Sequence, residues 1–324
     1  MRAIRSDGRT IRVDRDVPTP EAREGEVVVR PLRLGVSGED VRVARAPAAF
    51  TGVLGHEFVG VVEHAVGGSA AERLVGRRVV GSSLVACGRC PMCRGGLSTH
   101  CAARTVLGVL GRDGCFAERF VIPASNLVAL PASVSDDAAV CAHSLGRVLH
   151  AMRMLRLEGK AYVSVLGDGA LALLAAQAMA ARNASVRLLG RHGSNLDLCG
   201  KWGVKHRGEH EAGRRHDQDV VFDCVGDASS VDLALGLVRP RGTLVLLNAP
   251  HDSPGAPDAR RVVEHELVVL GSRGAAIGDA VVALASGAVD ALSLVTRRFR
   301  FDDAIEAIRA AGEPGALKVL LDAA

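Results

Sequence analysis

Aromatic side chains and excess charge are both scarce in this chain of 324 residues. It has 7 Phe, 1 Trp and 1 Tyr, and its 40 basic and 36 acidic residues leave a net charge of only +4. Proteins that bind nucleic acid usually carry a strongly basic surface, and many stack bases on aromatic rings. We therefore expect no nucleic-acid partner.

Long hydrophobic runs and a secretory leader are missing as well. The longest weakly polar stretch, residues 169–181, is interrupted by Gln177 and is shorter than the roughly 20 residues that a membrane-spanning helix needs. The first ten residues, MRAIRSDGRT, are charged and lack the apolar stretch and cleavage site of a signal peptide. We expect a cytoplasmic protein without a membrane partner.

The pattern of strands and helices changes along the chain. Residues 26–122 are rich in Val, Gly and Pro and contain short strand-like runs, which predicts an all-β region. Residues 136–157 begin acidic and end basic, as suits a helix and its dipole. From about residue 161, continuous apolar strands alternate with helices, which is typical of a parallel sheet covered on both faces. The length itself predicts about two domains.

Four of the eight cysteines fall in one short segment, CGRCPMCRGGLSTHC. In a reducing compartment cysteines rarely form disulfides, so their spacing is better read for metal or redox chemistry. Four thiolates on one loop can complete a tetrahedral shell around zinc and leave no position open for a substrate. The sequence therefore predicts a structural zinc site, with free surface thiols or a redox-active pair as alternatives. The four residues are Cys87, Cys90, Cys93 and Cys101.

A phosphate-binding turn is predicted where the strand AYVSVL runs into GDGALA. This segment places Gly167 and Gly169, and then Ala172, at the small-residue positions of the dinucleotide-binding motif. A tight turn of this kind lets backbone amides and a helix N-terminus face a pyrophosphate. Three further residues follow later strands of the series and are expected to contact the dinucleotide: Val225, Gly226 and Ser272.

The cofactor preference is predicted from the end of the next strand. About 20 residues beyond the glycine turn, NAD-selective sites usually carry an Asp or Glu that binds the ribose 2′-hydroxyl. This chain has Gly190 there, followed by Arg191 and His192. A guanidinium can pair with a 2′-phosphate in a two-pronged geometry, so we expect NADP(H) rather than NAD(H). The alternative is a solvated Arg191 in an enzyme that accepts both cofactors.

The cysteine spacing, inside an all-β half followed by an α/β half, resembles the zinc-containing medium-chain dehydrogenases/reductases, which include alcohol, sorbitol, threonine and glucose dehydrogenases. Residues 55–63, GHEFVGVVE, correspond to the family's Gly-His-Glu motif, and residues 35–40, GVSGED, stand where the family has Gly-x-Cys-Gly-x-Asp. The resemblance covers nearly the whole chain. It implies an α/β fold with a GroES-like β-barrel catalytic domain, residues 1–150 and 275–324, and a Rossmann domain with a doubly wound parallel sheet, residues 151–274.

The same resemblance implies an activity and its partners. The expected reaction is NAD(P)-dependent interconversion of a small-molecule alcohol and a carbonyl compound, by hydride transfer at an interdomain cleft. Family members are commonly homodimers or homotetramers. They also often carry a basic residue near the pyrophosphate, at a position that Lys318 occupies here.

The expected catalytic centre departs from the family pattern. The family holds a second zinc with a Cys, the His of Gly-His-Glu and a third Cys or Glu. This chain keeps His56 and Glu57, but Ser37 replaces the first ligand, and a neutral hydroxyl is a poor zinc ligand. The third ligand position falls on His143, or on Cys141 if the alignment slips by two residues.

Three hypotheses about the mechanism follow. In the first, zinc is held by His56, Glu57 and His143, together with water or Ser37. Alternatively the centre has no metal, and Ser37, His56 or His143 donates a hydrogen bond or proton to the developing oxyanion while NADPH delivers hydride. The third possibility is a non-catalytic NADP-binding protein that kept the fold after its ligands changed. Ordinary helix packing is the alternative for His143 and Cys141.

Overall fold

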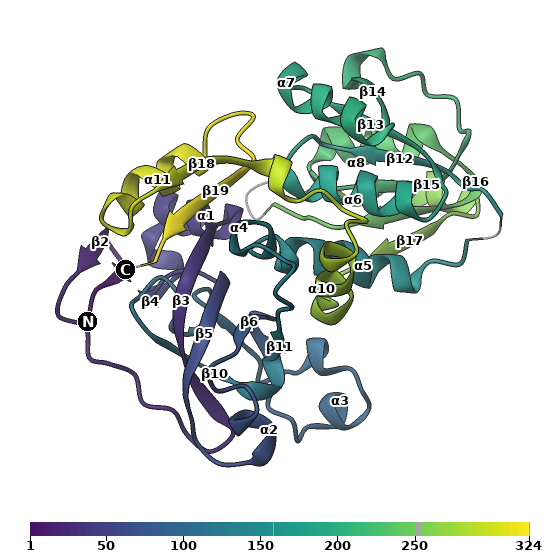
Figure 1. Cartoon of the computed structure of the whole chain (residues 1–324). Helices are drawn as coiled ribbons and strands as arrows, with labels where there is room; N and C mark the ends of the chain where they lie inside the picture. Colours follow the sequence, from purple (N-terminus) through teal and green to yellow (C-terminus); the bar gives the residue numbers. More distant parts are fainter. Residues whose placement is uncertain (158, 251–253, 324) are drawn as a thin grey trace. The chain divides into compact units, whose positions relative to one another are not determined.

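The computed structural model describes residues 1–157, 159–250 and 254–323, and the chain forms two compact units (Figure 1). The first unit comprises Met1–His143, Ala280–Ala285 and Ala291–Ala324, and the second comprises Ser144–Asp279 and Ser286–Asp290. The sequence predicts boundaries after residue 150 and before residue 275, and the observed boundaries differ from these by a few residues. The difference arises at the N-terminal side because the helix that begins at Ala142 belongs to the second unit from Ser144 onward.

A mainly antiparallel sheet of order β11-β6-β5-β3-β19-β18 forms the centre of the first unit, and β10 also pairs with β3. Its strands are β3 (Glu26–Val36), β5 (Glu57–Ala65), β6 (Arg78–Gly81), β10 (Phe120–Pro123), β11 (Leu127–Ala129), β18 (Val295–Phe299) and β19 (Lys318–Asp322). Two smaller sheets have the orders β2-β1-β4 and β7-β8-β9. Their strands are β1 (Ala3–Asp7), β2 (Ile11–Asp14), β4 (Thr51–Val53), β7 (Leu84–Val85), β8 (Thr105–Leu107) and β9 (Gly111–Arg112).

The C-terminal strand β19 completes this unit by pairing with β3, far away in the sequence. Figure 1 shows the yellow β19 beside the purple β3, and Leu320 lies opposite Gly35 in the register. On its other side β3 pairs with β5, which places Gly35 opposite Glu57. The central strand β3 therefore holds the start of β5 and the C-terminal strand next to each other. The helices assigned to this unit are α1 (Gly38–Arg45), α2 (Ser69–Glu72), α3 (Pro91–Arg94), α4 (Asp136–Ala139) and α11 (Ala304–Ala311).

The second unit contains a parallel sheet of order β14-β13-β12-β15-β16-β17. The strands are β12 (Tyr162–Leu166), β13 (Ser185–Gly190), β14 (Lys205–Gly208), β15 (Gln218–Asp223), β16 (Val238–Leu246) and β17 (Val268–Gly271). Counted within the unit this is the order 3-2-1-4-5-6 of the Rossmann fold. The expected fold class, a β-barrel unit with a doubly wound parallel-sheet unit, is confirmed.

Helices connect the parallel strands, as the alternating sequence pattern predicts. They are α6 (Ala170–Ala181), α7 (Gly193–Leu196), α8 (Ala228–Leu237) and α9 (Ala259–Glu264). Two more helices, α5 (Ala142–Met154) and α10 (Ile277–Ala285), each contribute residues to both units. Helix α6 is almost entirely buried, which explains why its sequence is apolar on every side.

The helix predicted over residues 136–157 is two helices in the structure. Helix α4 begins after Ser135, whose hydroxyl oxygen accepts a hydrogen bond from the amide of Ala138, and it ends before Val140. Val140 and Cys141 are buried between α4 and α5, and Val140 packs on Gly35 of β3. The charge pattern could not show this break because it depends on tertiary packing. Within the described residues, none of the helices has the length and apolar character needed to span a membrane.

Candidate functional site

The four clustered cysteines lie on the loop between β7 and β8, whose antiparallel pairing closes the base of the loop. The Sγ atoms of Cys90 and Cys93 are 3.5 Å apart, those of Cys90 and Cys101 3.9 Å, and those of Cys87 and Cys93 4.0 Å. All four sulfurs lie within 4.8 Å of one another. Zinc–sulfur bonds of ~2.3 Å at tetrahedral angles place sulfurs ~3.8 Å apart. The loop therefore has the dimensions of a zinc site.

Backbone amides of the loop favour the thiolate form of its first cysteine. The amides of Arg89 and Cys90 donate toward Cys87 and lower its pKa to about 6. The amide of Cys87 in turn donates to the sulfur of Cys101 at 3.4 Å, and Cys101 is fully buried. The thiolate is the form that binds metal, so the local backbone favours a ligating state of Cys87 near neutral pH.

A second polar centre forms inside the first unit from His56, Glu57 and His143. The possible ligand atoms of these three side chains lie within 4.8 Å of one another. His56 and Glu57 are 6% and 2% exposed. They lie at the start of β5, whereas His143 is in the first turn of α5, so the tertiary fold brings two distant segments together.

His143, and not Cys141, belongs to this centre. The Nε2 atom of His143 lies 3.0 Å from the hydroxyl oxygen of Ser83, and Nδ1 lies 3.9 Å from Glu57 Oε1. The ring of His143 also meets the ring of His56 edge to face, with centroids 5.3 Å apart. Cys141 is fully buried, and its burial raises the pKa of the thiol to about 11. It is therefore a neutral thiol at physiological pH.

One ring nitrogen of His56 is available to a ligand. His56 Nδ1 is buried and has no hydrogen-bond partner among the residues that the structure describes, and the same holds for Asp40 Oδ1. Buried polar atoms are rarely left unpaired in native proteins. An orphaned nitrogen next to Glu57 and His143 fits either a metal ion or the oxygen of a substrate.

Ser37 is a helix cap in the structure. Its hydroxyl donates to Asp40 Oδ2 at 2.6 Å, and its oxygen accepts the amide of Asp40 at 3.3 Å, so the two residues form the capping box that begins α1. Burial raises the pKa of Asp40, while the imidazole of His56 and the hydrogen bonds from Ser37 act in the opposite direction. Because the Ser37 proton is bound to Asp40, this hydroxyl is a weaker candidate for contacting a substrate than His56.

Lys318 forms a buried ion pair inside the first unit. The sequence predicts a contact with the pyrophosphate, but Lys318 lies in β19 of the first unit, is 4% exposed and donates to Glu57 Oε2 in a buried ion pair. Strands β19 and β5 flank β3, which brings the two side chains together. The ammonium is neutralised within its own unit by Glu57, and its contact with the pyrophosphate stays a prediction.

The buried pair has opposite effects on its two members. Burial by itself raises the pKa of Glu57, but the charges of Lys318, His56 and His143 outweigh it and lower the pKa to about 2. Burial likewise lowers the pKa of Lys318, and the carboxylate of Glu57 more than compensates, so that the pKa is raised. Both residues are therefore charged at neutral pH.

The residues expected to bind the dinucleotide share one edge of the parallel sheet. In the register, Leu166 lies beside Leu189 and Asp223, and Leu246 lies between Asp223 and Gly271. The carboxyl ends of the strands are thus aligned, and the residues that follow them lie along the same edge. Those located at or just beyond this edge are Gly167, Gly169, Ala172, Gly190, Arg191, His192, Val225, Gly226 and Ser272.

The glycine turn has the conformation of a phosphate-binding loop. Gly167 has φ of 102°, a left-handed conformation that favours glycine. Gly169 is the N-cap of α6 and offers no side chain to the first amides of the helix, which leaves them free for an anion. Ala172 is 1% exposed and packs close to Gly167. A small third residue is therefore required by packing.

The turn after β15 and Ser272 after β17 differ in whether their polar atoms already have hydrogen-bond partners. The amides of Val225 and Gly226 both donate to Asp223 Oδ1 at 2.9 Å, so this turn is held by its own strand. Asp223 is fully buried, and burial raises its pKa. The hydroxyl of Ser272, after β17, is buried and has no hydrogen-bond partner in the described part of the chain. Ser272 is therefore the better candidate for a polar contact with a ligand.

A carboxylate stands at the end of β13, although the sequence has Gly190 at the position where an acidic residue is usual. Asp168, from the glycine turn, accepts hydrogen bonds from the amides of Arg191 and His192, each at 2.6 Å. The guanidinium of Arg191 is also engaged, because its Nε donates to Glu209 Oε1 at 2.6 Å. The sequence motif concealed Asp168 because the positions between its glycines accept many residues.

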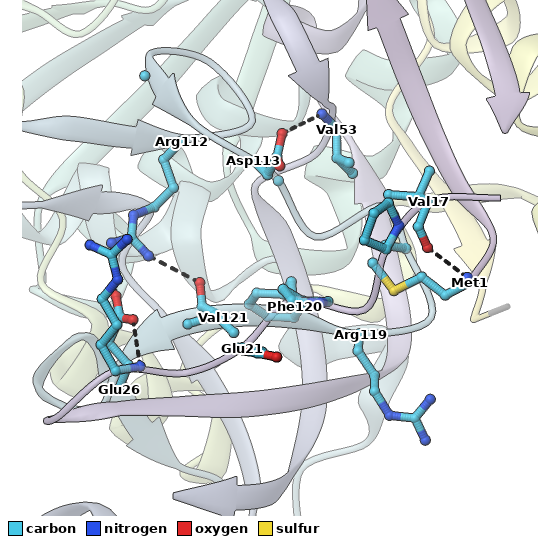
Figure 2. A pocket seen from close by; sticks show the side chains of 16 residues that line it. Met1, Val17, Glu21, Glu26, Val53, Arg112, Asp113, Arg119, Phe120 and Val121 are labelled. Atoms are coloured by element: carbon cyan, nitrogen blue, oxygen red, sulfur yellow. Dashed lines mark hydrogen bonds and ion pairs between the residues drawn. The ribbon is translucent and has the colours of Figure 1, made fainter. Parts of the chain in front are cut away.

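A separate pocket of about 300 Å³ in the first unit carries none of the expected site residues (Figure 2). Arg112 pairs with Glu26 there and donates to the carbonyl of Val121, and Asp113 accepts the amide of Val53. Neither Cys nor His lines it. The pocket therefore shares no residue with either predicted metal site.

Sequence reasoning missed Ser83 and Asp168 altogether. Ser83 lies after β6 with no motif around it, and only the fold brings it to His143. Asp168 is inside a motif whose glycines alone carry the signal. A signal for Asp168 was nevertheless present, because a carboxylate in the phosphate-binding turn is a departure from the apolar character of the neighbouring strand and helix.

Comparisons with known proteins identify the family and the fold. The alcohol dehydrogenase GroES-like domain matches residues 23–132. An L-threonine 3-dehydrogenase of Chelativorans sp. (strain BNC1) is 31% identical over 330 residues, which cover 94% of each chain. Among solved structures, a short chain alcohol dehydrogenase from E. coli CFT073 complexed with NADH has a TM-score of 0.89 and 26% identity and covers 99% of both chains. An alcohol dehydrogenase from Thermus sp. ATN1 has a TM-score of 0.87 and 28% identity, also over 99% of both chains.

Proposed function

The chain belongs to the zinc-containing medium-chain dehydrogenases/reductases, and from this premise we propose that it is an NAD(P)(H)-dependent oxidoreductase that interconverts an alcohol and a carbonyl compound. The observation that carries the proposal is the group of the buried His56 and Glu57 with the partly exposed His143, in which one ring nitrogen of His56 has no partner among the described residues. The same chain contains a Rossmann sheet with a glycine turn. A nicotinamide cofactor, when bound, supplies or accepts the hydride.

In this proposal, residues of the first unit bind the substrate oxygen and transfer its proton. His56 Nδ1 is the atom that hydrogen-bonds to this oxygen and exchanges a proton with it as the carbonyl forms or is reduced. The ring of His143 meets the ring of His56 edge to face, and His143 is itself oriented by Ser83 and Glu57. Glu57 stays ionised beside Lys318 and lies close to the two imidazoles.

We propose zinc in the four-cysteine loop, where Cys87, Cys90, Cys93 and Cys101 hold it as a structural ion. A second zinc at the polar centre would be held by His56, Glu57 and His143, and there it would polarise the substrate oxygen. Two contacts favour a centre without metal. The hydroxyl of Ser37 donates its hydrogen bond to Asp40, and the ammonium of Lys318 already neutralises Glu57. The metal-independent reductase is therefore the second candidate.

Replacing His56 with alanine is expected to lower kcat/KM by about a hundredfold or more, because general acid–base catalysis typically contributes that much. Turnover is measured with a panel of alcohols and carbonyl compounds and both cofactors, alongside zinc content per chain. The matched control is His64→Ala, an exposed histidine of the same strand, which should leave turnover unchanged.

The zinc content separates the two candidates. About two zincs per chain, falling to about one in His56→Ala, support a catalytic zinc, whereas about one zinc with full turnover supports the metal-independent centre. Tight cofactor binding without turnover over the whole panel contradicts the proposed activity and favours a non-catalytic cofactor-binding protein.

We also propose that the chain forms a homodimer through β17, or a homotetramer built on it. β17 ends the parallel sheet in the described residues, and its Val268 and Val269 are 52% and 36% exposed. Exposed apolar edge strands readily pair with another chain. Sedimentation should give a multiple of the 33.7 kDa chain mass, and Val268→Lys should shift it toward one chain. A monomeric wild type rules out this interface.

A further inference from the structure

Asp168 occupies the adenosine end of the expected dinucleotide site. It lies between the two glycines of the turn and is 8% exposed. Its Oδ2 accepts the amides of Arg191 and His192 at 2.6 Å each, and Nδ1 of His192 is 3.1 Å from both carboxylate oxygens. The side-chain amide of Asn195 donates to its backbone carbonyl at 3.1 Å. The position of this carboxylate is therefore fixed from several directions.

The carboxylate fills the space that a side chain at position 190 would enter. A Cβ atom on Gly190 would lie 2.5 Å from Asp168 Cβ and 2.7 Å from its Oδ2, distances at which atoms overlap. Gly190 is where NAD-selective sites commonly carry their acidic residue. The acidic group is thus present at the end of β13, but it comes from the glycine turn.

The backbone amides at the end of β13 are already hydrogen-bonded to the carboxylate of Asp168. A 2′-phosphate placed there would compete with the Asp168 carboxylate for the amides of Arg191 and His192. The ring of His192 is directed at the same carboxylate through its Nδ1 atom. Both backbone amides and the imidazole that the sequence offers to a 2′-phosphate therefore already contact Asp168.

The guanidinium of Arg191 is surrounded by acidic groups. Its Nε donates to Glu209, and its Nη2 donates to Ser229 at 3.4 Å, whose hydroxyl donates to Asp227 at 2.8 Å. Glu209, Asp227 and Asp168 all stabilise its positive charge. Three carboxylates around one guanidinium make this region unfavourable for a phosphate dianion.

We propose that Asp168 determines the cofactor specificity of this protein: its carboxylate accepts a hydrogen bond from the ribose hydroxyl of NAD(H) and repels the 2′-phosphate of NADP(H). This inference rests on the proposed function and replaces the expectation of NADP(H), which assumed that no carboxylate was present. Gly190 supports the arrangement by leaving room for Asp168. The specificity is therefore set within the glycine turn and not at the end of β13.

Calorimetric titration of the full chain with NADH and with NADPH tests the proposal without any need for a substrate. Wild type should bind NADH at least about tenfold more tightly. Asp168→Asn keeps the shape but removes the charge, so it should tighten NADPH binding by about tenfold or more and weaken NADH binding several-fold. Asp219→Asn is the matched control, because Asp219 lies at the opposite, amino end of β15 and should change neither affinity.

Glu209→Gln provides a second variant that does not alter the glycine turn. By removing one negative charge beside Arg191 it should tighten NADPH binding several-fold and leave NADH binding unchanged, and it decides the question if Asp168→Asn fails to fold, as judged by circular dichroism. Tighter binding of NADPH by wild type, or an unchanged NADH-to-NADPH ratio in the folded variants, overturns the role of Asp168 while leaving the dehydrogenase function intact. Failure of folded wild type to bind either dinucleotide contradicts the proposed function itself.

Discussion

Replacing Cys101 with alanine is expected to remove zinc from the four-cysteine loop and to lower the melting temperature by about 10 °C or more. Cys101 is fully buried and close to both Cys90 and the amide of Cys87. Structural zinc binds zinc-finger peptides with about 10–16 kcal/mol of apparent free energy, and losing a third of such a contribution shifts a melting temperature by roughly this amount. Zinc per chain and thermal unfolding are measured on the same preparations.

The matched control for this prediction is Cys199→Ala. Cys199 is equally buried but lies in the second unit, outside both groups of metal-ligating side chains. The Cys199→Ala variant should keep the zinc content of wild type and lose only the packing of one sulfur atom. Equal zinc content in Cys101→Ala and wild type would falsify the assignment of the loop as a zinc site. A redox-active pair would instead show a disulfide under mild oxidation and no zinc.

Replacing Lys318 with methionine is expected to destabilise the protein by about 3–5 kcal/mol at pH 7. Removing one partner of a buried ion pair leaves the other charge without compensation, and here the remaining charge is Glu57, which is 2% exposed. Methionine fills a similar volume, so the loss comes chiefly from the charge. The free energy of unfolding from denaturant titration measures it.

Acidification should reduce the difference in stability between wild type and Lys318→Met. The pKa of Glu57 is about 2 in the folded wild type, below its usual value of 4.5, so the stability from its ionisation is complete above pH 4.5. It is lost as the pH falls from about 4.5 through about 2. Without Lys318, burial favours the neutral acid, and the variant should regain stability as the pH falls. The difference between the two proteins therefore shrinks in acid.

Two further variants make the ion-pair prediction specific. Glu57→Gln combined with Lys318→Met removes both charges and should recover most of the loss. Lys205→Met, on the exposed strand β14, should change stability by less than about 0.5 kcal/mol. A loss in Lys318→Met that the double variant does not reduce, or that is constant with pH, means that Lys318 contributes packing and not charge.

Local sequence was sufficient where a site is built from neighbouring residues. The four cysteines are close in the chain, so their spacing alone predicted the cluster that the loop between β7 and β8 forms. The glycine turn after β12 was predictable for the same reason, since strand, turn and helix are consecutive. The alternation of apolar strands and helices likewise predicted the parallel sheet, because each strand is buried on both faces.

Long-range contacts explain what the sequence could not predict. Lys318 meets Glu57 only because β19 and β5 are the two neighbours of β3, and no spacing in the sequence encodes that pairing. The choice between His143 and Cys141 depended on the break between α4 and α5, which is set by packing against β3.

The sequence by itself determined the fold class, the cysteine cluster, the nucleotide turn and the family resemblance, since each rests on local periodicity or on residues a few positions apart. Only the tertiary structure decided which side chains share the polar centre and that a carboxylate stands beside Gly190. These are contacts between residues far apart in the chain. Their distances depend on strand order, register and burial, which a single sequence does not specify.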